Sequence, residues 1–255
     1  MIYKLNECQV FLYDGIVVIS RNLEVYFSNH SRKILRVPIL CDADEIQPGR
    51  IPGPIDGTVF KICFAGYIKF DKEGFDILFE SLYELNKDKN VELYLYGILE
   101  QSDRIRMNKS SEKYQLTDKV KYRGNIDPAL LQDEFTKYDL LILPRPLNKR
   151  TKYGFSTKLS EYLVSGVPVL LTDVSDNALF IKDNYNGFMI PPGSAQAMTE
   201  KILEIIENYN DKAGMIVENA YRTVREELDY RLFSDLYINF FFGSEDMLEP
   251  LTESK

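Results

Sequence analysis

Four residues within positions 153–173 have the types and the spacing to bind a phosphorylated ligand. A glycine turn with small hydroxyl side chains comes first, at Gly154, Ser156 and Thr157, and an amphipathic helix with Glu161 near its start follows. Free backbone amides at a helix start attract phosphate. A carboxylate in that place repels phosphate, but it can accept hydrogen bonds from sugar hydroxyls. Phosphate together with hydroxyls indicates a nucleotide or a nucleotide-sugar as the ligand.

The elements that must position these residues alternate along the chain as apolar strands and amphipathic helices. The expected strands are 16–20, 34–40, 61–66, 91–97, 119–124, 140–144, 167–172 and 188–192. The expected helices are 75–86, 102–113, 128–137, 156–165 and 195–208. This alternation predicts an α/β fold in which helices cover both faces of a parallel sheet. Ligands of such sheets bind beyond the carboxyl ends of the strands, where Gly66, Gly97 and Gly124 leave room near the backbone.

Three segments are expected from the order of these patterns. Residues 1–50 form a strand–helix–strand remnant of an N-terminal domain with its linker, because one such unit buries little by itself. The Pro-, Gly- and Asp-rich stretch 42–57 indicates that linker. Residues 51–230 form the main domain, and 231–255 an aromatic helix with a frayed tail. The helix at 232–243 has more apolar positions than one stripe can hide, so we expect it to lie between two domains or to dock a partner.

The composition limits the classes of partner and site. The chain has 255 residues and a formal net charge of −8, so its overall field disfavours nucleic acid. Its three cysteines lack CxxC spacing, which argues against disulfides or a zinc site, and we interpret them as reduced in a cytoplasmic protein. No apolar run approaches the roughly 20 residues of a membrane span, and the first residues lack a signal-peptide layout. The chain has one histidine, His30, so a Ser-His-Asp triad or a multi-histidine metal site would have to use it.

The order of the motifs resembles the donor-binding C-terminal half of a GT-B glycosyltransferase, in the large retaining family four (group 1). The resemblance extends from about Asp14 to Asn208. It rests on segments that keep the family's order and spacing: DGIVVIS, VPIL, FAGYIKFDKEGFDIL, ELYLYG, VKYRGNI, YDLLILPRP, GFSTKLSEYLVSGVPVLLTD and NYNGFMIPPG. It implies a Rossmann-like sheet and transfer of a hexose from a nucleoside-diphosphate sugar to a glycan or lipid acceptor on the cytosolic side, with no metal or other cofactor. It also implies a missing N-terminal acceptor domain or partner subunit, and an acceptor that brings the protein near a membrane.

The resemblance assigns a role to each motif residue. Glu161 matches the glutamate that holds the ribose hydroxyls, and the backbone at 124–126 lies against the base. Lys72, Lys69 and Arg145 are the expected catalytic cations, because negative charge grows on the leaving phosphate during transfer. The residues expected to bind the donor are Gly66, Tyr67, Gly124, Asn125, Ile126, Tyr153, Gly154, Phe155, Ser156, Thr157, Lys158 and Glu161.

Two positions depart from the family pattern. Tyr153 stands where an acid usually touches the transferred sugar, and Tyr67 stands where an arginine usually follows the glycine. Both departures favour a rival interpretation, a binding or regulatory module that kept the fold but lost the chemistry. A nucleotide-sugar epimerase is a further rival, although it usually needs more than one histidine. Lys158 and Glu161, three residues apart, would in a plain helix simply pair with one another.

Overall fold

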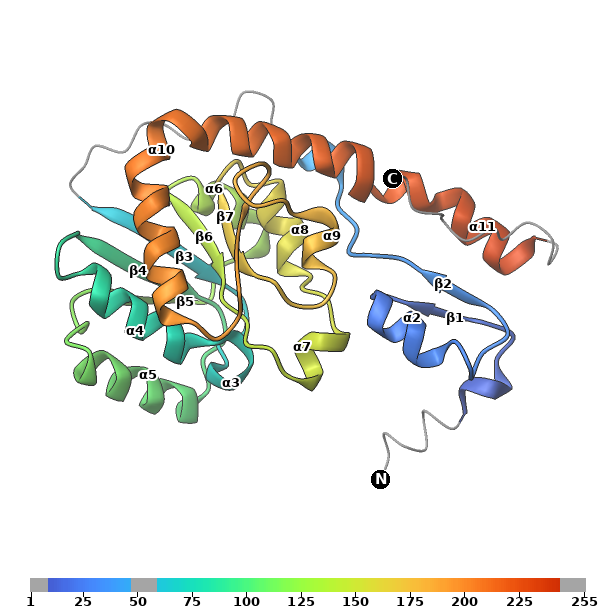
Figure 1. Cartoon of the computed structure of the whole chain (residues 1–255), viewed down its shortest axis with the longest axis horizontal. Helices are drawn as coiled ribbons and strands as arrows, with labels where there is room; N and C mark the ends of the chain where they lie inside the picture. The colour runs from blue at the N-terminus through green and yellow to red at the C-terminus, as the bar shows by residue number, and fades with distance from the viewer. Residues whose placement is uncertain (1–8, 47–58, 244–255) are drawn as a thin grey trace.

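The computed structural model describes residues 9–46 and 59–243, and most of them surround one six-stranded parallel sheet (Figure 1). Its strands are β3 (Phe60–Ala65), β4 (Val91–Tyr96), β5 (Val120–Gly124), β6 (Leu140–Leu143), β7 (Val169–Thr172) and β8 (Phe188–Ile190). They are arranged in the order β5-β4-β3-β6-β7-β8. The order reverses between β3 and β6, where Ile62 lies beside Leu140. A ligand crevice is therefore expected beyond the carboxyl ends of these central strands.

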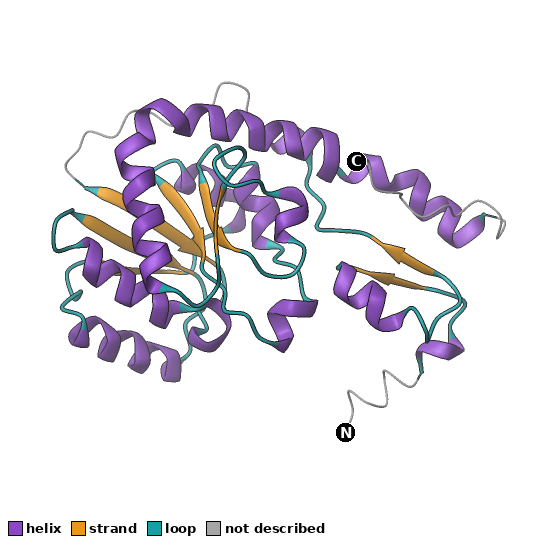
Figure 2. Cartoon of the chain, viewed as in Figure 1, coloured by secondary structure: helices purple, strands orange, loops and turns teal. Residues whose placement is uncertain are grey.

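Helices cover both faces of this sheet, as the sequence predicts (Figure 2). Right-handed crossovers place α4 (Phe75–Leu85) and α5 (Gln101–Lys113) on one face. They place α6 (Pro128–Phe135), α8 (Lys158–Leu163) and α9 (Asn177–Phe180) on the other. The rings of Phe135 and Tyr162 meet at 5.2 Å, which joins α6 to α8. The single-turn α3 (Phe70–Glu73) and the short α7 (Lys149–Tyr153) occupy loops at the carboxyl edge, and α3, α7 and α9 were not predicted.

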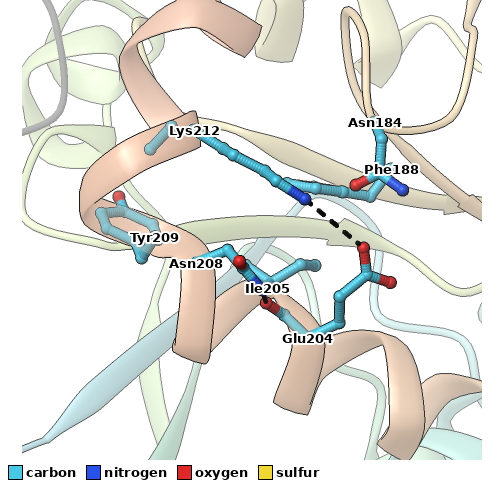
Figure 3. Close-up of a pocket in the computed structure, with 8 residues that line it drawn as sticks. Asn184, Phe188, Glu204, Ile205, Asn208, Tyr209 and Lys212 are labelled. Atoms are coloured by element: carbon cyan, nitrogen blue, oxygen red, sulfur yellow. Dashed lines mark hydrogen bonds and ion pairs between the residues drawn. The ribbon is translucent and has the colours of Figure 1, made fainter.

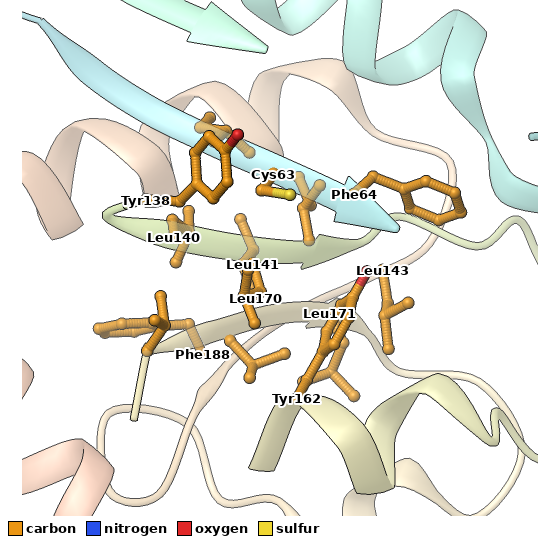
Figure 4. Close-up of a cluster of buried hydrophobic side chains, with 14 of the residues drawn as sticks. Cys63, Phe64, Tyr138, Leu140, Leu141, Leu143, Tyr162, Leu170, Leu171 and Phe188 are labelled. Carbon is orange, nitrogen blue, oxygen red and sulfur yellow. The ribbon is translucent and has the colours of Figure 1, made fainter. Parts of the chain in front are cut away.

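The core of the sheet consists of strand residues that are buried on both faces (Figure 4). Every residue of β6 and β7 is buried, which explains their unbroken apolar sequences. Phe64 on β3 and Tyr162 on α8 are fully enclosed. The hydroxyl of Tyr162 accepts a hydrogen bond from the amide of Ala65 at 2.8 Å, so the buried ring also ties α8 to the end of β3. The core thus fixes α8 against the carboxyl edge of the sheet.

The helix expected at 195–208 continues much further, as α10 (Ala195–Thr223). Its buried stripe does not stop at Asn208, because Tyr209, Ala213, Ile216 and Ala220 repeat at helical spacing and all are buried. The first part of α10 packs against α4, where the hydroxyl of Thr199 donates to that of Ser81 at 2.9 Å. A π-helical turn, η3 (Val224–Leu228), and a 3-10 turn, η4 (Tyr230–Phe233), then lead to α11 (Ser234–Phe242).

The N-terminal segment forms a separate small sheet beside α11 (Figure 1). Its elements are η1 (Val10–Leu12), β1 (Ile16–Val18), α2 (Arg21–Phe27), β2 (Ile34–Arg36) and η2 (Ala43–Glu45), with β1 and β2 parallel. Phe233 and Phe240 pack on Leu35 and Val37 in one small cluster. The aromatic helix therefore contacts the N-terminal segment, but it is not buried between two domains within the described residues, because Ile238, Phe241 and Phe242 are exposed. Most of the expected linker and all of the expected frayed tail lie outside the described residues.

Contacts at the base of α2 join this segment to the main domain. The Ser20 hydroxyl donates to the carbonyl of Tyr153 at 2.7 Å, and the Arg21 amide donates to Asp176 at 2.8 Å. On the other side, the amide of Cys41 donates to the carbonyl of Leu228 at 2.8 Å. Within residues 9–46 and 59–243, no helix is long and apolar enough to cross a membrane.

Candidate functional site

A pocket of about 530 Å³ opens at the carboxyl edge of the sheet, above the ends of β3, β4 and β5. Its volume lies within the range typical of small-molecule sites, roughly 300–1,000 Å³. The loop before α6, the start of α6 and the first turn of α8 contribute to its walls. The lining residues are Ala65, Gly66, Tyr67, Tyr96, Gly97, Ile98, Asn125, Ile126, Pro128, Leu131, Thr157, Lys158 and Glu161. The pocket thus lies where the sheet order predicts a ligand.

Two glycines shape the pocket floor. Gly66 has a φ of 141°, and a Cβ added to it would lie 1.9 Å from Cε of Lys158. Gly97 has a φ of 115°, and a Cβ added there would lie 2.0 Å from the carbonyl oxygen of Gly66. Both positions therefore require glycine, for the backbone conformation and for the space. The absence of a side chain at Gly66 is what lets Lys158 extend across the end of β3.

The first turn of α8 brings a cation and a carboxylate to the same pocket. Lys158 and Glu161 both line it, and their spacing of three places them on one side of the helix. The Lys158 ammonium pairs with Glu73 at 3.1 Å. Glu161 is exposed as a residue, but nearby protein atoms displace part of the water around its carboxylate and raise its pKa. Lys158 opposes this shift, and Glu45 adds to it. An acceptor for hydroxyls and a donor for phosphate thus share one ligand-sized pocket.

The three expected catalytic cations are engaged by acids, and none of them is among the pocket-lining residues. Lys69 pairs with Glu100 at 2.6 Å and with Asp103 at 3.0 Å. Lys72 pairs with Glu73 at 3.5 Å. Arg145 is nearly buried, and its Nε donates to Glu73 at 3.0 Å. The pocket cation of this group of basic residues is therefore Lys158.

Glu73 is a charged residue next to the pocket that the sequence did not reveal. Its side chain is 0% exposed and is contacted by Lys72, Arg145 and Lys158. Burial by itself would raise the pKa of Glu73, but Arg145, Lys158 and Lys72 outweigh it and hold the pKa below its ordinary value. Its sequence context, FDKEG, indicates a solvated turn. The sequence held one signal for this arrangement, Gly74. This glycine adopts a φ of 70° and ends the single helical turn of α3, in which Glu73 is buried.

The glycine turn at 154–156 lies outside the pocket lining. The Phe155 ring stacks on Phe180 at 5.8 Å, and Gly154 caps α7. The Tyr153 ring packs edge-on against Tyr26 at 5.8 Å, on the side of the N-terminal segment. Ser156 is buried, and its hydroxyl has no hydrogen-bond partner in the described part of the chain. Of the expected turn residues, Thr157 is the one that reaches the pocket.

The other predicted donor residues lie on the pocket or at its border. Tyr67 lines it, and its hydroxyl donates to Glu100. Asn125 and Ile126 line the wall where the base is expected, and Gly124 ends the strand below them. Tyr96, Ile98, Pro128 and Leu131 also line the pocket and were not predicted, because they mark no charge or turn in the sequence. They give the expected base side an apolar and aromatic surface.

Other candidate groups have plain structural roles. A hollow between β8 and α10 has no free volume, and Lys212 faces Glu204 across it at 3.9 Å (Figure 3). Asp42 and Asp44, two acids of the Pro-, Gly- and Asp-rich stretch, pair with Arg231 at 2.7 and 2.9 Å. His30 lies next to α2, with its ring stacked on Tyr26 at 6.1 Å. No group of three His, Cys, Asp or Glu side chains suited to a metal occurs within residues 9–46 and 59–243.

Comparison with known proteins gives the family. The model of the family described as "Glycosyl transferases group 1" matches residues 50–223, which is more than half of the chain. The chain belongs to the group 1 glycosyltransferases. The match covers all six strands of the main sheet and the whole pocket lining.

Curated relatives of this glycosyltransferase chain are much longer than it is. It is 28% identical over 142 residues to a sucrose synthase of Melioribacter roseus, covering 53% of this chain and 18% of the relative. It is 23% identical over 192 residues to the GtfA subunit of a Streptococcus pneumoniae UDP-N-acetylglucosamine–peptide N-acetylglucosaminyltransferase, covering 71% and 35%. It is 21% identical over 174 residues to an uncharacterized glycosyltransferase of Methanocaldococcus jannaschii, covering 67% of this chain and 42% of the relative. The chain thus spans less than half of each of these relatives.

Solved structures share the fold. A sucrose-phosphate synthase from Thermosynechococcus elongatus superposes with a TM-score of 0.77 at 18% identity, over 94% of this chain and 62% of that one. Anabaena HepE, solved with UDP and glucose, gives 0.77 at 17% identity, over 93% and 66%. Pneumococcal GtfA, solved with UDP and GlcNAc, superposes with a TM-score of 0.72 at 20% identity. The match covers 94% of this chain and 47% of GtfA. These likenesses show the GT-B type of fold for this glycosyltransferase chain.

Proposed function

We propose that this chain is the donor-binding half of a retaining, metal-independent glycosyltransferase that transfers a hexose from a nucleoside-diphosphate sugar. The observation that carries the proposal is that Lys158 and Glu161 both line one pocket of about 530 Å³ at the carboxyl edge of the sheet. A cation suits the diphosphate, and a carboxylate suits the ribose hydroxyls. Structural relatives solved with UDP and a sugar support the same class of ligand.

The charge balance around the pocket also favours an anionic ligand. Three cations, Lys72, Arg145 and Lys158, contact the single carboxylate of Glu73. The group therefore carries a surplus of two positive charges, which a diphosphate would neutralise. During transfer the bond between the anomeric carbon and the diphosphate breaks, and negative charge grows on the leaving phosphate. A cation that is already in place stabilises this charge without reorganising.

The acceptor and its binding groups are proposed to lie beyond the residues described. A glycan or lipid precursor on the cytosolic side is the acceptor we propose, with a further domain or a partner subunit completing the site. The N-terminal segment supports this proposal, because its helices η1 and α2 expose large apolar side chains. Phe11 is 71% exposed, and Val25 is 66% exposed. We expect the 255-residue chain alone to bind nucleotide weakly and to transfer little.

Calorimetry of the 255-residue chain with a panel of nucleoside diphosphates and their sugars tests the proposal. Glu161→Ala is expected to abolish binding while circular dichroism shows an intact fold. Glu112→Ala removes an exposed carboxylate from α5, outside the pocket, and serves as the matched control. If no member of the panel binds, or if both variants weaken binding equally, the proposal is wrong.

A second candidate is a module that binds the nucleotide-sugar without transferring it. The observation in its favour is the pair of tyrosines, Tyr67 and Tyr153, at positions expected to carry a base and an acid. Tyr153 also packs against Tyr26 in the N-terminal segment, which suits a contact residue. Hydrolysis or transfer of the bound nucleotide-sugar by the complete assembly would favour the enzyme. Tight binding with an unchanged donor in that assembly would favour the module.

A further inference from the structure

Glu73 has an unusual setting for a residue of a charged loop. It ends the single-turn helix α3, and its carboxylate is completely buried. A close backbone approach puts it there, since a Cβ added to the next residue, Gly74, would lie 2.0 Å from the carbonyl oxygen of Pro144. This approach brings Glu73 beside Arg145, whose own carbonyl accepts from the Thr172 hydroxyl at 2.7 Å. The carboxylate is thus fixed by the backbone at the ends of β6 and β7.

Lys158 reaches this carboxylate through an apolar passage. Its chain crosses Gly66, and its ammonium lies 5.1 Å from the centre of the Phe64 ring. Burial lowers the pKa of Lys158 below its ordinary value, Glu73 opposes the shift, and Arg145 and Lys72 add to it. Without an acid at this point, a buried lysine beside two other cations loses its proton easily. The neutral amine would then be a poor partner for phosphate.

We infer that Glu73 is a positioning residue for the proposed reaction: its carboxylate holds the Lys158 ammonium charged and extended across Gly66 at the pocket. An ammonium has three hydrogens to donate. One of them is directed to Glu73 at 3.1 Å, which leaves the others for the phosphate of a ligand. Arg145 holds Glu73 from the opposite side through two hydrogen bonds, at 3.0 and 3.4 Å. This inference rests on the proposed function.

The charged groups around Lys158 come from three elements. Lys72 and Glu73 lie on α3, and Arg145 follows β6. Glu161 lies on α8 itself and is influenced by Lys158. Glu161 is kept in every variant of the test. A change in the protonation of Lys158 is therefore attributable to the loss of Glu73. Removing Glu73 leaves two cations, Arg145 and Lys72, to repel the ammonium.

The test is the pH dependence of UDP affinity between pH 7 and 8.5, above the titration of the terminal phosphate at about 6. Wild-type affinity is expected to be nearly flat across this range. In Glu73→Gln, affinity is expected to fall with rising pH by up to about tenfold per unit, because one proton becomes linked to binding. Adding Lys158→Arg in that background is expected to restore a flat profile, since arginine stays charged. Glu92→Gln, whose carboxylate pairs with Lys121 at 2.8 Å outside the pocket, is the matched control.

The outcomes separate this inference from the proposed function. No binding of UDP or any other nucleoside diphosphate by the wild type overturns the proposed function. Binding by the wild type, with parallel pH profiles for Glu73→Gln and Glu92→Gln, overturns the role of Glu73 alone. If Glu73→Gln does not fold, the protonation state of Lys158 is followed in the wild type through its side-chain NMR signal. A charged Lys158 throughout pH 7–8.5 supports the inference, and its deprotonation in that range overturns it.

Discussion

The loop between β3 and α4 and the first turn of α8 both border the pocket, and both carry lysines. In the loop, Lys69 is engaged by Glu100 and Asp103, while Lys72 lies beside Glu73. From α8, Lys158 crosses Gly66 and lines the pocket. The family pattern leads one to expect the cations on the first of these two segments. In this chain the second segment provides the pocket cation, and the first provides the acid that holds it.

This difference teaches that the position of a lysine in a motif does not by itself place the lysine in the pocket lining. Tyr67 occupies the position where the family has an arginine, and its hydroxyl donates to Glu100. The outer part of the loop thus sets one cation, Lys69, against two acids. The inner part, around Glu73, carries the positive surplus. Four substitutions challenge this contrast, and they follow in order of expected effect.

Arg145→Met is expected to have the largest effect. It leaves the buried carboxylate of Glu73 with the two lysines, Lys72 and Lys158, and breaking a buried ion pair costs about 3–5 kcal/mol of stability. Urea unfolding measures the loss. Arg106→Met removes a partly exposed arginine that pairs with Asp71 and Asp76, and it should cost about 1 kcal/mol or less. Equal losses of unfolding free energy in Arg145→Met and Arg106→Met would contradict the claim that the buried ion pairs of Glu73 contribute more stability than exposed ones.

Lys158→Met is expected to lower UDP affinity by roughly 10- to 100-fold, because a hydrogen bond to a charged group contributes about 1.5–3 kcal/mol. Lys69→Met, on the facing segment, should change affinity less than about twofold, since that side chain is already paired with two acids. Isothermal titration calorimetry gives both values. A larger loss for Lys69→Met would reverse the comparison.

The stability contributed by Glu73 should depend on pH. Burial acts to raise its pKa, but the surrounding cations hold it below the ordinary value. A carboxylate with a lowered folded-state pKa contributes stability that is complete above the unfolded pKa, about 4.3, and is lost as pH falls through the folded value. Unfolding of the wild type and Glu73→Gln at pH 7, 5, 4 and 3 checks the sign. Their difference should shrink toward pH 3, and a constant difference would argue against an ionised Glu73.

Tyr67→Arg restores the family's cation on the loop and should have the smallest effect. Tyr67 already lines the pocket, so the new guanidinium can reach the ligand or the acid Glu100. An exposed ion pair contributes up to about 1 kcal/mol, which corresponds to no more than about a fivefold gain in UDP affinity. Calorimetry on the single variant and on Tyr67→Arg with Lys158→Met measures the gain. Full rescue of Lys158→Met would show that the two segments are interchangeable.

The fold was largely predictable because its signals are local. The apolar sequences of β6 and β7 have no polar interruption, and both strands are buried throughout. The end of α10 was missed because Asn208, Asn210 and Gly214 are weak helix formers, although the buried stripe continues through Tyr209. The short helices α3 and α7 were missed for a different reason. A single turn is stabilised by its contacts, such as that of Gly74 with Pro144, and these contacts lie far apart in the sequence.

The site was predictable at the level of segments, but its charge pairing was not. Lys158, Glu161 and the wall at Asn125 and Ile126 line the pocket as expected. The pairing of Lys158 with Glu73 joins residues that are 85 positions apart, and nothing in either neighbourhood indicates it. The glycine turn at 154–156 was expected to bind the donor, yet none of its three residues lines the pocket. Gly154 caps α7, and the Phe155 ring stacks on Phe180 of α9. Whether its backbone meets phosphate stays a prediction.

The most direct test of the central claim is an NMR titration of the lysine side-chain signals with UDP. Lys158→Arg, Lys69→Arg and Lys72→Arg variants assign the three signals that matter. If Lys158 is the pocket cation, its signal shifts and saturates along the calorimetric binding curve, while those of Lys69 and Lys72 stay in place. UDP binding that moves Lys69 or Lys72 and leaves Lys158 unchanged would contradict the account.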